Sequence, residues 1–371
     1  MSNEPKILPS APESPLSSVI CAAITQAGGW IGFDRFMELA LYTPGLGYYS
    51  GGLPKIGAMP EGGSDFVTAP EMSPLFGATL AVQVQEALVH TGTDEVWEFG
   101  AGTGALAAQL LTALDALGQP LRRYHIVDLS GDLRARQQER LAAWGERVCW
   151  HSTLPAHMTG VVLGNELLDA MPVQLIARVD GQWYERGVAW QGHGLAWEDR
   201  PTALRPPLDV EGEHDYLTEL HAQGEAFIHT LGERLARGAL LLIDYGFGES
   251  EYYHPQRSMG TVMCHQAHRA DPDPLTAVGA KDITAHVNFT AIAVAGQEAG
   301  FEVLGYTSQG HFLVNCGLLQ KMELVTLAQR AMAAKLMLEH EMGELFKVLL
   351  LAKGAPWPAV GFGHGDRTHR L

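Results

Sequence analysis

Three glycines alternate with small residues in the stretch Val96–Ala107, VWEFGAGTGALA. A strand-like pattern precedes them and an alanine-rich helical pattern follows, and such a turn brings backbone N–H groups and a helix N-terminus against a nucleotide. Gly100, Gly102 and Ala105 fit the dinucleotide pattern G-x-G-x-x-G/A. Gly100 and Gly102, together with Gly104, equally fit the G-x-G-x-G pattern of S-adenosylmethionine enzymes. The glycines therefore predict a nucleotide-type site and leave its ligand open.

Two acidic residues near this turn bear on the identity of the ligand. Glu98 stands at the end of the predicted strand, two residues before Gly100, where its carboxylate would face the ligand. A buried carboxylate is unfavourable beside a pyrophosphate, whereas S-adenosylmethionine offers a sulfonium and an ammonium group. Asp128, at the end of the next predicted strand, would bind a ribose, a contact that serves NAD equally well. Glu98 therefore favours S-adenosylmethionine over NAD, Asp128 supports a nucleoside without choosing between them, and an ordinary glycine-rich turn is the remaining alternative.

A second group of polar residues lies in the stretch GNELLDAMPV, at the predicted end of another strand. Asn165 could hydrogen-bond the methionine part of the cofactor. Glu166 and Asp169 could pair with a cationic or proton-bearing nucleophile, and carboxylates suit a guanidinium because its planar fork donates two parallel hydrogen bonds to one carboxylate. The alternative is a helix N-cap, where the helix dipole stabilises acidic residues.

Two further segments carry polar residues in loop-like surroundings. The stretch GGSDFVTAP contains Asp65 and Thr68 and would make a plausible lid over a cofactor. The stretch CHQAHR places His265 and His268 three residues apart beside Cys264. Metal binding would require more ligands at matching spacing, so we expect no metal site.

The composition limits the classes of partner and compartment. The chain has 371 residues, 46% of them hydrophobic, which is typical of one large or two ordinary globular domains. Its net charge of −17 would repel a nucleic-acid backbone, so we expect no nucleic-acid partner. The four cysteines form no C-x-x-C pair, and no stretch of 18 unbroken apolar residues predicts a membrane span. With no signal-peptide pattern near the N-terminus, we expect a cytoplasmic protein.

The order of predicted elements indicates how these residues are positioned. Strands and helices alternate from about residue 91 to residue 172, which predicts an α/β fold with a parallel, doubly wound, Rossmann-like sheet. Val173–Trp197 predicts a small antiparallel excursion, and helices are expected over Glu213–Arg237 and Leu318–His340. The predicted organisation is, in order, a disordered tail at 1–17, a helical segment with a cofactor-covering loop at 18–90, a nucleotide-binding core at 91–172, an antiparallel and helical insertion at 173–237, the rest of the core at 238–354 with a substrate loop at 246–282, and a loose tail at 355–371.

Several stretches resemble the MidA-like methyltransferases, bacterial and mitochondrial relatives of the complex I assembly-factor methyltransferase. The similar stretches lie between about Ile31 and Gly354 and are FMELALYTPGLGYYS, SDFVTAPEMSPLFG, VWEFGAGTGALA, NELLDAMPV, IDYGFGESEYY, MGTVMCHQAHR and DITAHVNF. The resemblance implies a class I methyltransferase fold with a family-specific substrate domain, and S-adenosylmethionine as the cofactor. It also implies a protein arginine as methyl acceptor, as in mitochondrial members, and a respiratory-complex subunit as a candidate partner.

The resemblance also implies roles for individual residues. Glu98, Gly100 and Gly102 would hold the methionine part, Asp128 the ribose, and Asn165 and Glu166 would lie beside the methyl donor. The complete candidate set is Asp65, Thr68, Pro70, Glu98, Gly100, Gly102, Thr103, Asp128, Leu129 and Asn165 for the cofactor, with Glu166 and Asp169 for catalysis. The chain departs from the family at Asp128, where Glu is common, at Asn288, where Asp is common, and at Val262-Met263, where Leu-Arg is common.

The sequence therefore predicts an S-adenosylmethionine-dependent methyltransferase that acts on a protein arginine. Two alternatives stay open: an NAD-dependent oxidoreductase, which Glu98 disfavours, and a binding platform that keeps the fold without catalysis. The oligomeric state is left open as well.

Overall fold

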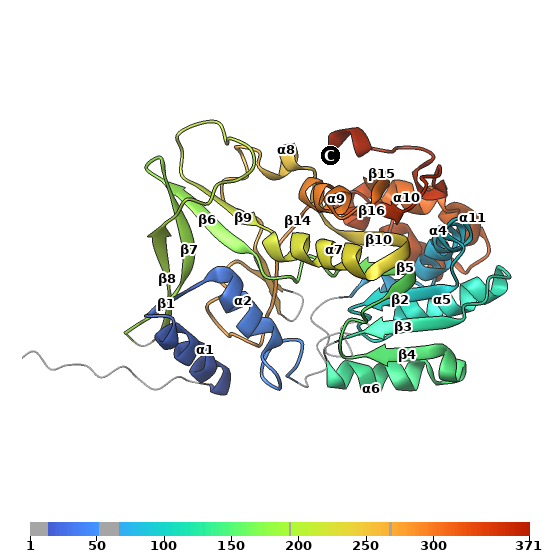
Figure 1. The fold of residues 1–371 in the computed structure, drawn as a ribbon, viewed down its shortest axis with the longest axis horizontal. Helices are drawn as coiled ribbons and strands as arrows, with labels where there is room; N and C mark the ends of the chain where they lie inside the picture. The colour runs from blue at the N-terminus through green and yellow to red at the C-terminus, as the bar shows by residue number, and fades with distance from the viewer. Residues whose placement is uncertain (1–13, 52–66, 129, 193, 267–268) are drawn as a thin grey trace, which may run out of the picture.

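The computed structural model describes residues 14–51, 67–128, 130–192, 194–266 and 269–371. Its largest sheet has the strand order β15-β16-β10-β5-β2-β3-β4, with β14 (Val287–Asn288) pairing with β10. The strands of this sheet are β2 (Glu95–Phe99), β3 (Arg123–Val127), β4 (Val148–His151), β5 (Met158–Asn165), β10 (Leu235–Phe247), β15 (Glu302–Ser308) and β16 (Phe346–Lys353). The predicted α/β class is confirmed, and the sheet lies to the right in Figure 1.

The sheet is parallel except at one strand. β16 runs antiparallel to both of its neighbours, β10 and β15, which the prediction of a parallel sheet did not include. The strand order reverses beside β2, where β3 pairs on one side and β5 on the other. The carboxyl ends of β2 and β5 therefore lie together at the switch point, where open α/β sheets bind their ligands.

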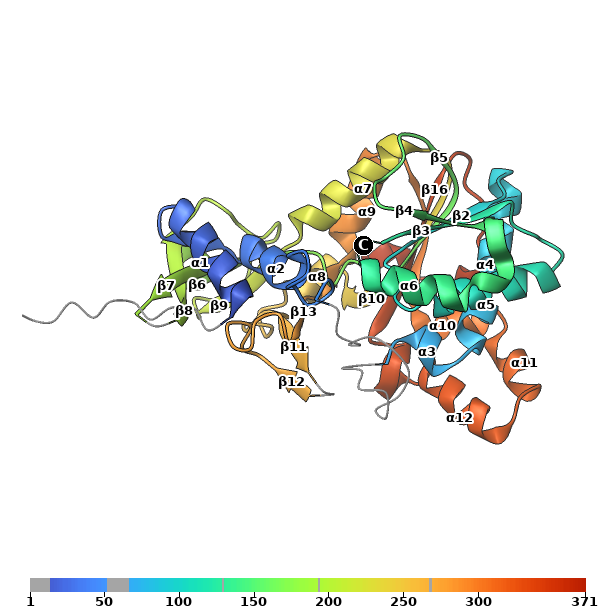
Figure 2. The same cartoon turned by 90° about the horizontal axis from the view of Figure 1, so that it is seen from below.

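Helices cover both faces of this sheet, as Figure 2 shows. On one face, α4 (Leu75–Thr91) and α5 (Ala105–Ala116) pack leucines and alanines against Val96 and Val161, with α6 (Gly131–Arg140) beside them. On the other face, α7 (Ala222–Arg234) and α9 (Phe289–Glu298) pack on β5, β10 and β16. These two apolar layers hold the strand ends of the site at fixed positions.

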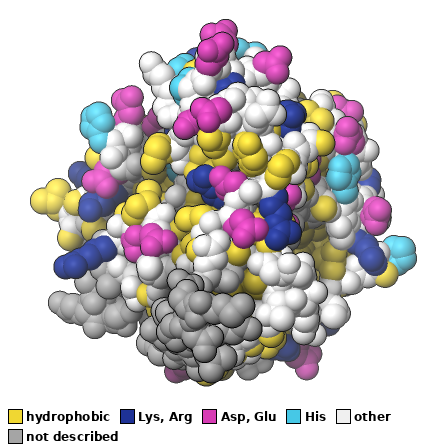
Figure 3. Space-filling view, turned by 90° about the vertical axis from the view of Figure 1, so that its left-hand side faces the viewer, with side chains coloured by type: hydrophobic (Ala, Val, Ile, Leu, Met, Phe, Trp, Pro, Cys, Tyr) yellow, Lys and Arg dark blue, Asp and Glu magenta, His cyan; other side chains and the backbone are white. Residues whose placement is uncertain are grey.

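A second lobe gathers segments that lie far apart in the sequence, and it occupies the left of Figure 1. Its helices are α1 (Pro15–Gln26) and α2 (Phe33–Tyr42), and its five-stranded sheet contains β1 (Trp30–Gly32), β6 (Gln174–Val179), β7 (Gln182–Gln191), β8 (Gly194–Pro201) and β9 (Tyr216–Leu220). A small sheet of β11 (Met263–Gln266), β12 (Arg269–Asp271) and β13 (Asp282–Thr284) joins the same apolar cluster. Figure 3 views this lobe end-on and shows acidic, basic and hydrophobic side chains interspersed over its described surface.

Three predicted elements differ in the structure. The helix expected over Glu213–Arg237 is instead β9 followed by α7, because residues from Tyr216 to Leu220 pair with β6 before the helix begins. The helix expected over Leu318–His340 is divided into α11 (Leu318–Glu323) and α12 (Leu327–Lys335), because Thr326 forms a capping box with Gln329. Of the predicted tail at 1–17, residues 1–13 lie outside the described residues, and residues 15–17 form the first turn of α1, after the N-cap Ser14.

The expectation of a loose tail at 355–371 is wrong. Trp357 and Phe362 are buried, and the Trp357 ring stacks on His90 with a centroid separation of 4.9 Å. Glu86 of α4 accepts hydrogen bonds from the indole N–H of Trp357 at 3.2 Å and from the backbone N–H of Val360 at 3.0 Å. The aromatic residues among the prolines and glycines anchor this segment to the core.

Removal of the Glu86 carboxylate should therefore destabilise the fold without touching the site. We expect Glu86→Ala to lower the free energy of unfolding by about 1–3 kcal/mol, the cost of leaving buried donors unpaired. Urea unfolding measures this loss, and Glu323→Ala, at an exposed position on α11, serves as the control. Equal stability in the two variants would contradict the anchoring role.

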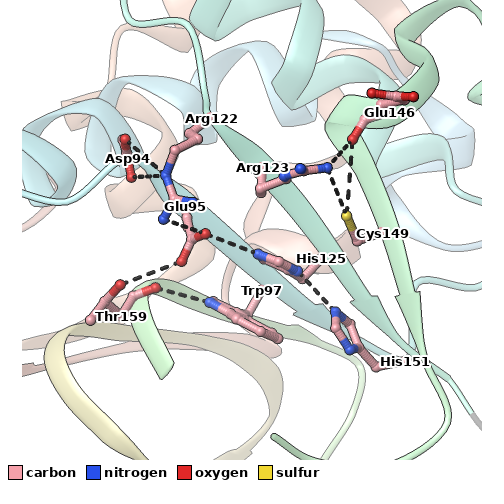
Figure 4. A network of polar contacts seen from close by, with 10 residues as sticks. All are labelled: Asp94, Glu95, Trp97, Arg122, Arg123, His125, Glu146, Cys149, His151 and Thr159. Atoms are coloured by element: carbon pink, nitrogen blue, oxygen red, sulfur yellow. Dashed lines mark hydrogen bonds and ion pairs between the residues drawn. The ribbon is translucent and has the colours of Figure 1, made fainter. Parts of the chain in front are cut away.

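A polar network occupies the sheet face opposite Glu98 (Figure 4). The His125 ring stacks on Trp97 with centroids 3.7 Å apart, and its Nδ1 lies 2.9 Å from Nε2 of His151. The Nε2 atom of His125 lies 3.3 Å from Glu95. Burial lowers the pKa of His125, so these rings are neutral at neutral pH. The connection from β4 to β5, residues 152–157, is short and contains no helix.

Candidate functional site

The glycine-rich turn after β2 requires glycine at each of its three predicted positions. Gly100, Gly102 and Gly104 have φ values of 64°, 53° and 81°, in the left-handed region that side chains disfavour. The N–H of Gly100 donates to the carbonyl of Val127 at 3.1 Å, which ties the turn to the end of β3. The turn then enters α5, with Gly104 as the N-cap.

One cavity of about 1070 Å³ opens at the carboxyl ends of β2, β3 and β5. Ten of the twelve candidate residues line it: Thr68, Pro70, Glu98, Gly100, Gly102, Thr103, Asp128, Asn165, Glu166 and Asp169. The other two, Asp65 and Leu129, lie outside the described residues. A volume at the upper end of the range for small-molecule sites leaves room for a cofactor and part of a second ligand.

Glu98 lies at the bottom of the cavity, inside the sheet. Its side chain accepts a hydrogen bond from the Tyr124 hydroxyl at 2.6 Å. Burial raises the pKa of Glu98 to about 7, the Tyr124 hydrogen bond lowers this pKa, and the charge of Asp128 raises it. The carboxyl therefore keeps a proton more readily than the sequence suggested, and a cation bound beside it would favour its ionised form.

Asp128 is held by two donors that fix its carboxylate at the end of β3. Its Oδ1 accepts from the N–H of Ser130 at 2.9 Å, and its Oδ2 accepts from Nε2 of Gln137 at 2.8 Å. Gln137, fully buried on α6, also donates to the carbonyl of Gly102 at 2.9 Å. Gln137 thus connects the acid expected to bind the ribose with the glycine turn, a link that sequence reasoning missed.

Thr103 joins the glycine turn to the segment before α4. Its hydroxyl donates to Glu71 of α3 (Ala69–Met72) and accepts from Nη1 of Arg140 at 2.6 Å. Arg140 also pairs with Glu71 at 2.7 Å. The carbonyl of Pro70 accepts from the Gln109 amide at 2.7 Å, so Thr68 and Pro70 belong to an anchored wall of the cavity. Both residues belong to the predicted lid at 62–70, whose residues 62–66 lie outside the described residues.

Glu166 and Asp169 lie in an irregular turn after β5, not at a helix start. Glu166 has a φ of 52°, and Asp169 is almost fully buried. Burial, followed by the charge of Asp244, raises the pKa of Glu166 to about 8. The same two causes raise the pKa of Asp169 well above its usual range, and the charge of Glu166 raises it further. The N-cap alternative is therefore wrong, because no helix begins between β5 and β6, and both carboxyls line the cavity instead.

The second lobe contributes residues that sequence reasoning missed. Asp282 of β13 lines the cavity and accepts a hydrogen bond from the Tyr49 hydroxyl at 2.8 Å. Tyr42, stacked on Tyr49 with centroids 5.6 Å apart, donates to the carbonyl of Ala170 at 2.7 Å. All three side chains lie in the stretches FMELALYTPGLGYYS and DITAHVNF, whose similarity to the family was the available signal.

The described lining is rich in hydrogen-bond acceptors and contains no lysine or arginine. Its carboxyl groups belong to Glu38, Glu71, Glu98, Asp128, Glu166, Asp169 and Asp282. The buried Oδ1 atom of Asn165 has no partner within the described part of the chain, which leaves one more acceptor for a ligand N–H. Such a wall suits cationic groups and disfavours a pyrophosphate, which argues against NAD.

An apolar end of the cavity would suit a flat base. Phe99 and Phe227 meet edge to face there with centroids 5.2 Å apart, and Leu154 lines the same cavity. Together with the donor and acceptor groups above, these residues fit the adenine, ribose and amino-acid parts of S-adenosylmethionine. Across the residues that the structure describes, no group of three or more His, Cys, Asp or Glu side chains is arranged to hold a metal ion, and no helix is long and apolar enough to span a membrane.

Comparisons with known proteins agree with this geometry. A sequence model of the S-adenosyl-L-methionine-dependent methyltransferases matches residues 79–307. A crystal structure from Burkholderia thailandensis with bound S-adenosyl-homocysteine is 48% identical, with a TM-score of 0.91 over 98% of this chain and 100% of that one. A native structure from the same organism is 47% identical, with a TM-score of 0.88 over the same shares.

Curated relatives are more distant in sequence. The mitochondrial protein arginine methyltransferase NDUFAF7 of Danio rerio is 27% identical over 81% of this chain and 76% of that protein. Its Drosophila melanogaster homologue is 28% identical over 77% of this chain and 71% of that protein. The chain thus belongs to the MidA-like family of S-adenosyl-L-methionine-dependent methyltransferases, and its cofactor is S-adenosyl-L-methionine.

Proposed function

We propose that the chain transfers the methyl group of S-adenosylmethionine to the guanidinium of a protein arginine. The observation that carries this proposal is the group of Glu166, Asp169 and Asp282, which share one cavity with the cofactor residues. A guanidinium offers five N–H donors in a plane and a delocalised positive charge, which match a wall made of carboxylates. Pairing with such a cation would restore the ionised state that burial disfavours in Glu166 and Asp169.

The same residues can meet the requirements of methyl transfer. S-adenosylmethionine supplies an electrophilic methyl group, and in-line displacement at this carbon depends mainly on the orientation of the nucleophile. Glu166 and Asp169 would hold the guanidinium in that orientation and accept the proton that the attacking nitrogen must lose. A carboxyl with a pKa of about 8, as at Glu166, is suited to proton transfer near neutral pH.

The choice of arginine is also supported by the relatives. Those from Danio rerio and Drosophila melanogaster are named protein arginine methyltransferases. We further propose that the acceptor protein is a respiratory-complex subunit, from the resemblance to the complex I assembly-factor methyltransferase. The expected site of action is the cytoplasm, since the cysteine spacing is typical of a reducing compartment.

Labelled S-adenosylmethionine tests this proposal. An extract of cells that lack the protein is incubated with the purified protein and the labelled cofactor, and labelled proteins are hydrolysed to amino acids. We expect label in methylated arginine. Label in methyllysine alone would overturn the choice of acceptor. If no protein is labelled, while the wild type and the Glu166→Gln variant restore the cells equally, the protein acts as a binding platform instead.

Cofactor affinity should depend on pH through Glu98. This carboxyl must lose its proton to pair with the cofactor ammonium, so binding of S-adenosylhomocysteine should weaken as the pH falls below about 7. Between pH 8 and pH 6 we expect the dissociation constant to rise about tenfold, because the carboxyl must release one proton on binding and pH 6 lies about one unit below its pKa. Calorimetry measures this change. Glu98→Gln should bind more weakly at pH 8 and show little change with pH, and a flat wild-type profile would contradict the pairing.

A further inference from the structure

We propose that Asp244 is a positioning residue that holds the turn carrying Glu166 and Asp169 in the geometry that methyl transfer requires. Asp244 lies near the end of β10, is almost fully buried, and is not among the residues that line the cavity. It therefore acts on the acceptor through the turn and not by contact. The inference rests on the proposed function in one respect, namely that this turn binds the methyl acceptor.

One carboxylate oxygen of Asp244 organises three consecutive backbone donors. Its Oδ2 accepts from the N–H groups of Leu167 at 3.1 Å, Leu168 at 2.8 Å and Asp169 at 3.2 Å. Its Oδ1 accepts from its neighbour Tyr245 at 2.9 Å. Successive N–H groups that converge on one anion form a concave nest, and here the anion belongs to the protein. The conformation of the turn therefore depends on a side chain 75 residues away in the sequence.

Other elements fix the remaining backbone groups of the turn. Glu166 N–H donates to the carbonyl of Ile243 at 2.9 Å, and Nε2 of the buried His221 lies 2.9 Å from the carbonyl of Leu168. The carbonyl of Asp169 accepts from the N–H of Ala285 at 2.9 Å, and that of Ala170 accepts from the Tyr42 hydroxyl. The turn has no regular structure of its own. It is held at one point each by β10, by the N-cap residue of α7, by the segment after β13 and by α2.

This support is needed because the turn contains a disfavoured backbone conformation. A glutamate with φ of 52° persists only where surrounding contacts over-determine it, and such positions cluster at active sites. Glu166 also receives the N–H of Ala69, so a shift of the turn would move its carboxylate away from the cofactor wall. A displacement of about 1 Å in a group that orients a reactant can reduce the rate about a hundredfold.

Replacement of Asp244 should therefore reduce turnover more than cofactor binding. We expect Asp244→Ala to lower kcat/KM for the acceptor protein at least a hundredfold, with kcat reduced and the KM for the acceptor raised. The affinity for S-adenosylhomocysteine should change less than tenfold. Rates are expressed per site able to bind S-adenosylhomocysteine, so loss of folded protein does not enter the comparison. Glu86→Ala is the matched control, since it removes a carboxylate that holds a backbone N–H far from the cavity and should keep kcat/KM within about twofold.

Two conservative variants separate positioning from charge. Asp244→Asn keeps an oxygen that can accept the three N–H groups but removes the negative charge and the acceptor of the Tyr245 N–H, and we expect kcat/KM within about fivefold of the wild type. Asp244→Glu keeps the charge but is longer by one methylene, which would displace the turn, and we expect a loss of at least tenfold. Both variants should fold even if Asp244→Ala does not.

The outcomes distinguish this inference from the proposed function. If the wild type methylates arginine and all three variants match its kcat/KM per site, the positioning role is overturned. Loss of activity in the Asn variant with full activity in the Glu variant would also overturn it, because Asp244 would then act by charge. If the wild type labels no protein at all, the proposed function fails, and a change in the backbone amide exchange of the 166–170 turn in Asp244→Ala would still test the structural part.

Discussion

Glu166→Gln and Asp169→Asn should each lower methyl transfer to protein by two or more orders of magnitude. Both carboxyls line the cavity beside the cofactor residues, and their neutral isosteres keep the shape while removing the charge that would orient a guanidinium. A hundredfold loss corresponds to at least ~2.7 kcal/mol of transition-state stabilisation. The measurement is initial rate with labelled cofactor and an extract of cells that lack the protein. Cofactor affinity should fall less in Asp169→Asn than in Glu166→Gln, since Glu166 is expected beside the methyl donor.

These substitutions should not destabilise the protein. If both residues lay at an exposed helix start, each substitution would change the free energy of unfolding by no more than about 1 kcal/mol. The structure instead places both carboxyls in a buried cluster where their ionised forms repel one another and Asp244. At pH 8.5 we therefore expect each variant to be more stable than the wild type, by about 1–2 kcal/mol. A variant that loses activity together with a stability loss of several kcal/mol would show that the effect on turnover is indirect.

That the candidate cofactor residues line one cavity could be predicted because the determinants of their positions are local. Gly100, Gly102 and Glu98 lie within five residues, and each has a role set by a strand, a tight turn and the following helix. Asp128 follows from the repeat of the strand–helix unit. Parallel strands that end at one edge of a sheet bring such residues together without further information.

The part of the cavity where we propose that the acceptor binds could not be predicted in the same way, because it depends on tertiary contacts. Tyr49 and Asp282, which form one hydrogen bond, are separated by 233 residues. Asp244 holds a turn that follows the neighbouring strand, β5, and nothing in the sequence around Asp244 distinguishes it from any acid at the end of a strand. The family resemblance marked all of these stretches, but the side-chain partners within them are defined only by the tertiary structure.

Two of the predictions that proved wrong have a related cause. The helical pattern over Glu213–Arg237 includes β9, where pairing with β6 overrides the local preference. The segment at 355–371 has few apolar residues, yet those few pack in the same apolar cluster as α4, a contact that sequence periodicity does not reveal. In both cases the partner that decides the outcome is remote in the chain.

The free energy of unfolding should fall as the pH rises from 7 to 8.5. Glu166 has a pKa of about 8 and Asp169 a strongly raised pKa, so the folded chain retains protons that the unfolded chain, with ordinary carboxyl pKa values, has already lost. The unfolded state therefore binds fewer protons across this range, and stability decreases with pH. The loss is about 2 kcal/mol for each proton that the folded chain retains across the whole of this interval. The buried histidines, such as His221 with a pKa of about 4, are mainly neutral in both states above pH 7 and contribute little.

Urea unfolding at pH 7 and pH 8.5 measures this slope, and the double variant Glu166→Gln, Asp169→Asn is the control. We expect the double variant to lose less than half as much stability as the wild type between the two pH values. An equal slope in the two proteins would place the titrating groups elsewhere. The repulsion that destabilises the empty site at high pH is the interaction that a bound cation removes. A guanidinium peptide bound with S-adenosylhomocysteine should consequently stabilise the wild type more at pH 8.5 than at pH 7, whereas the double variant should show little difference between the two.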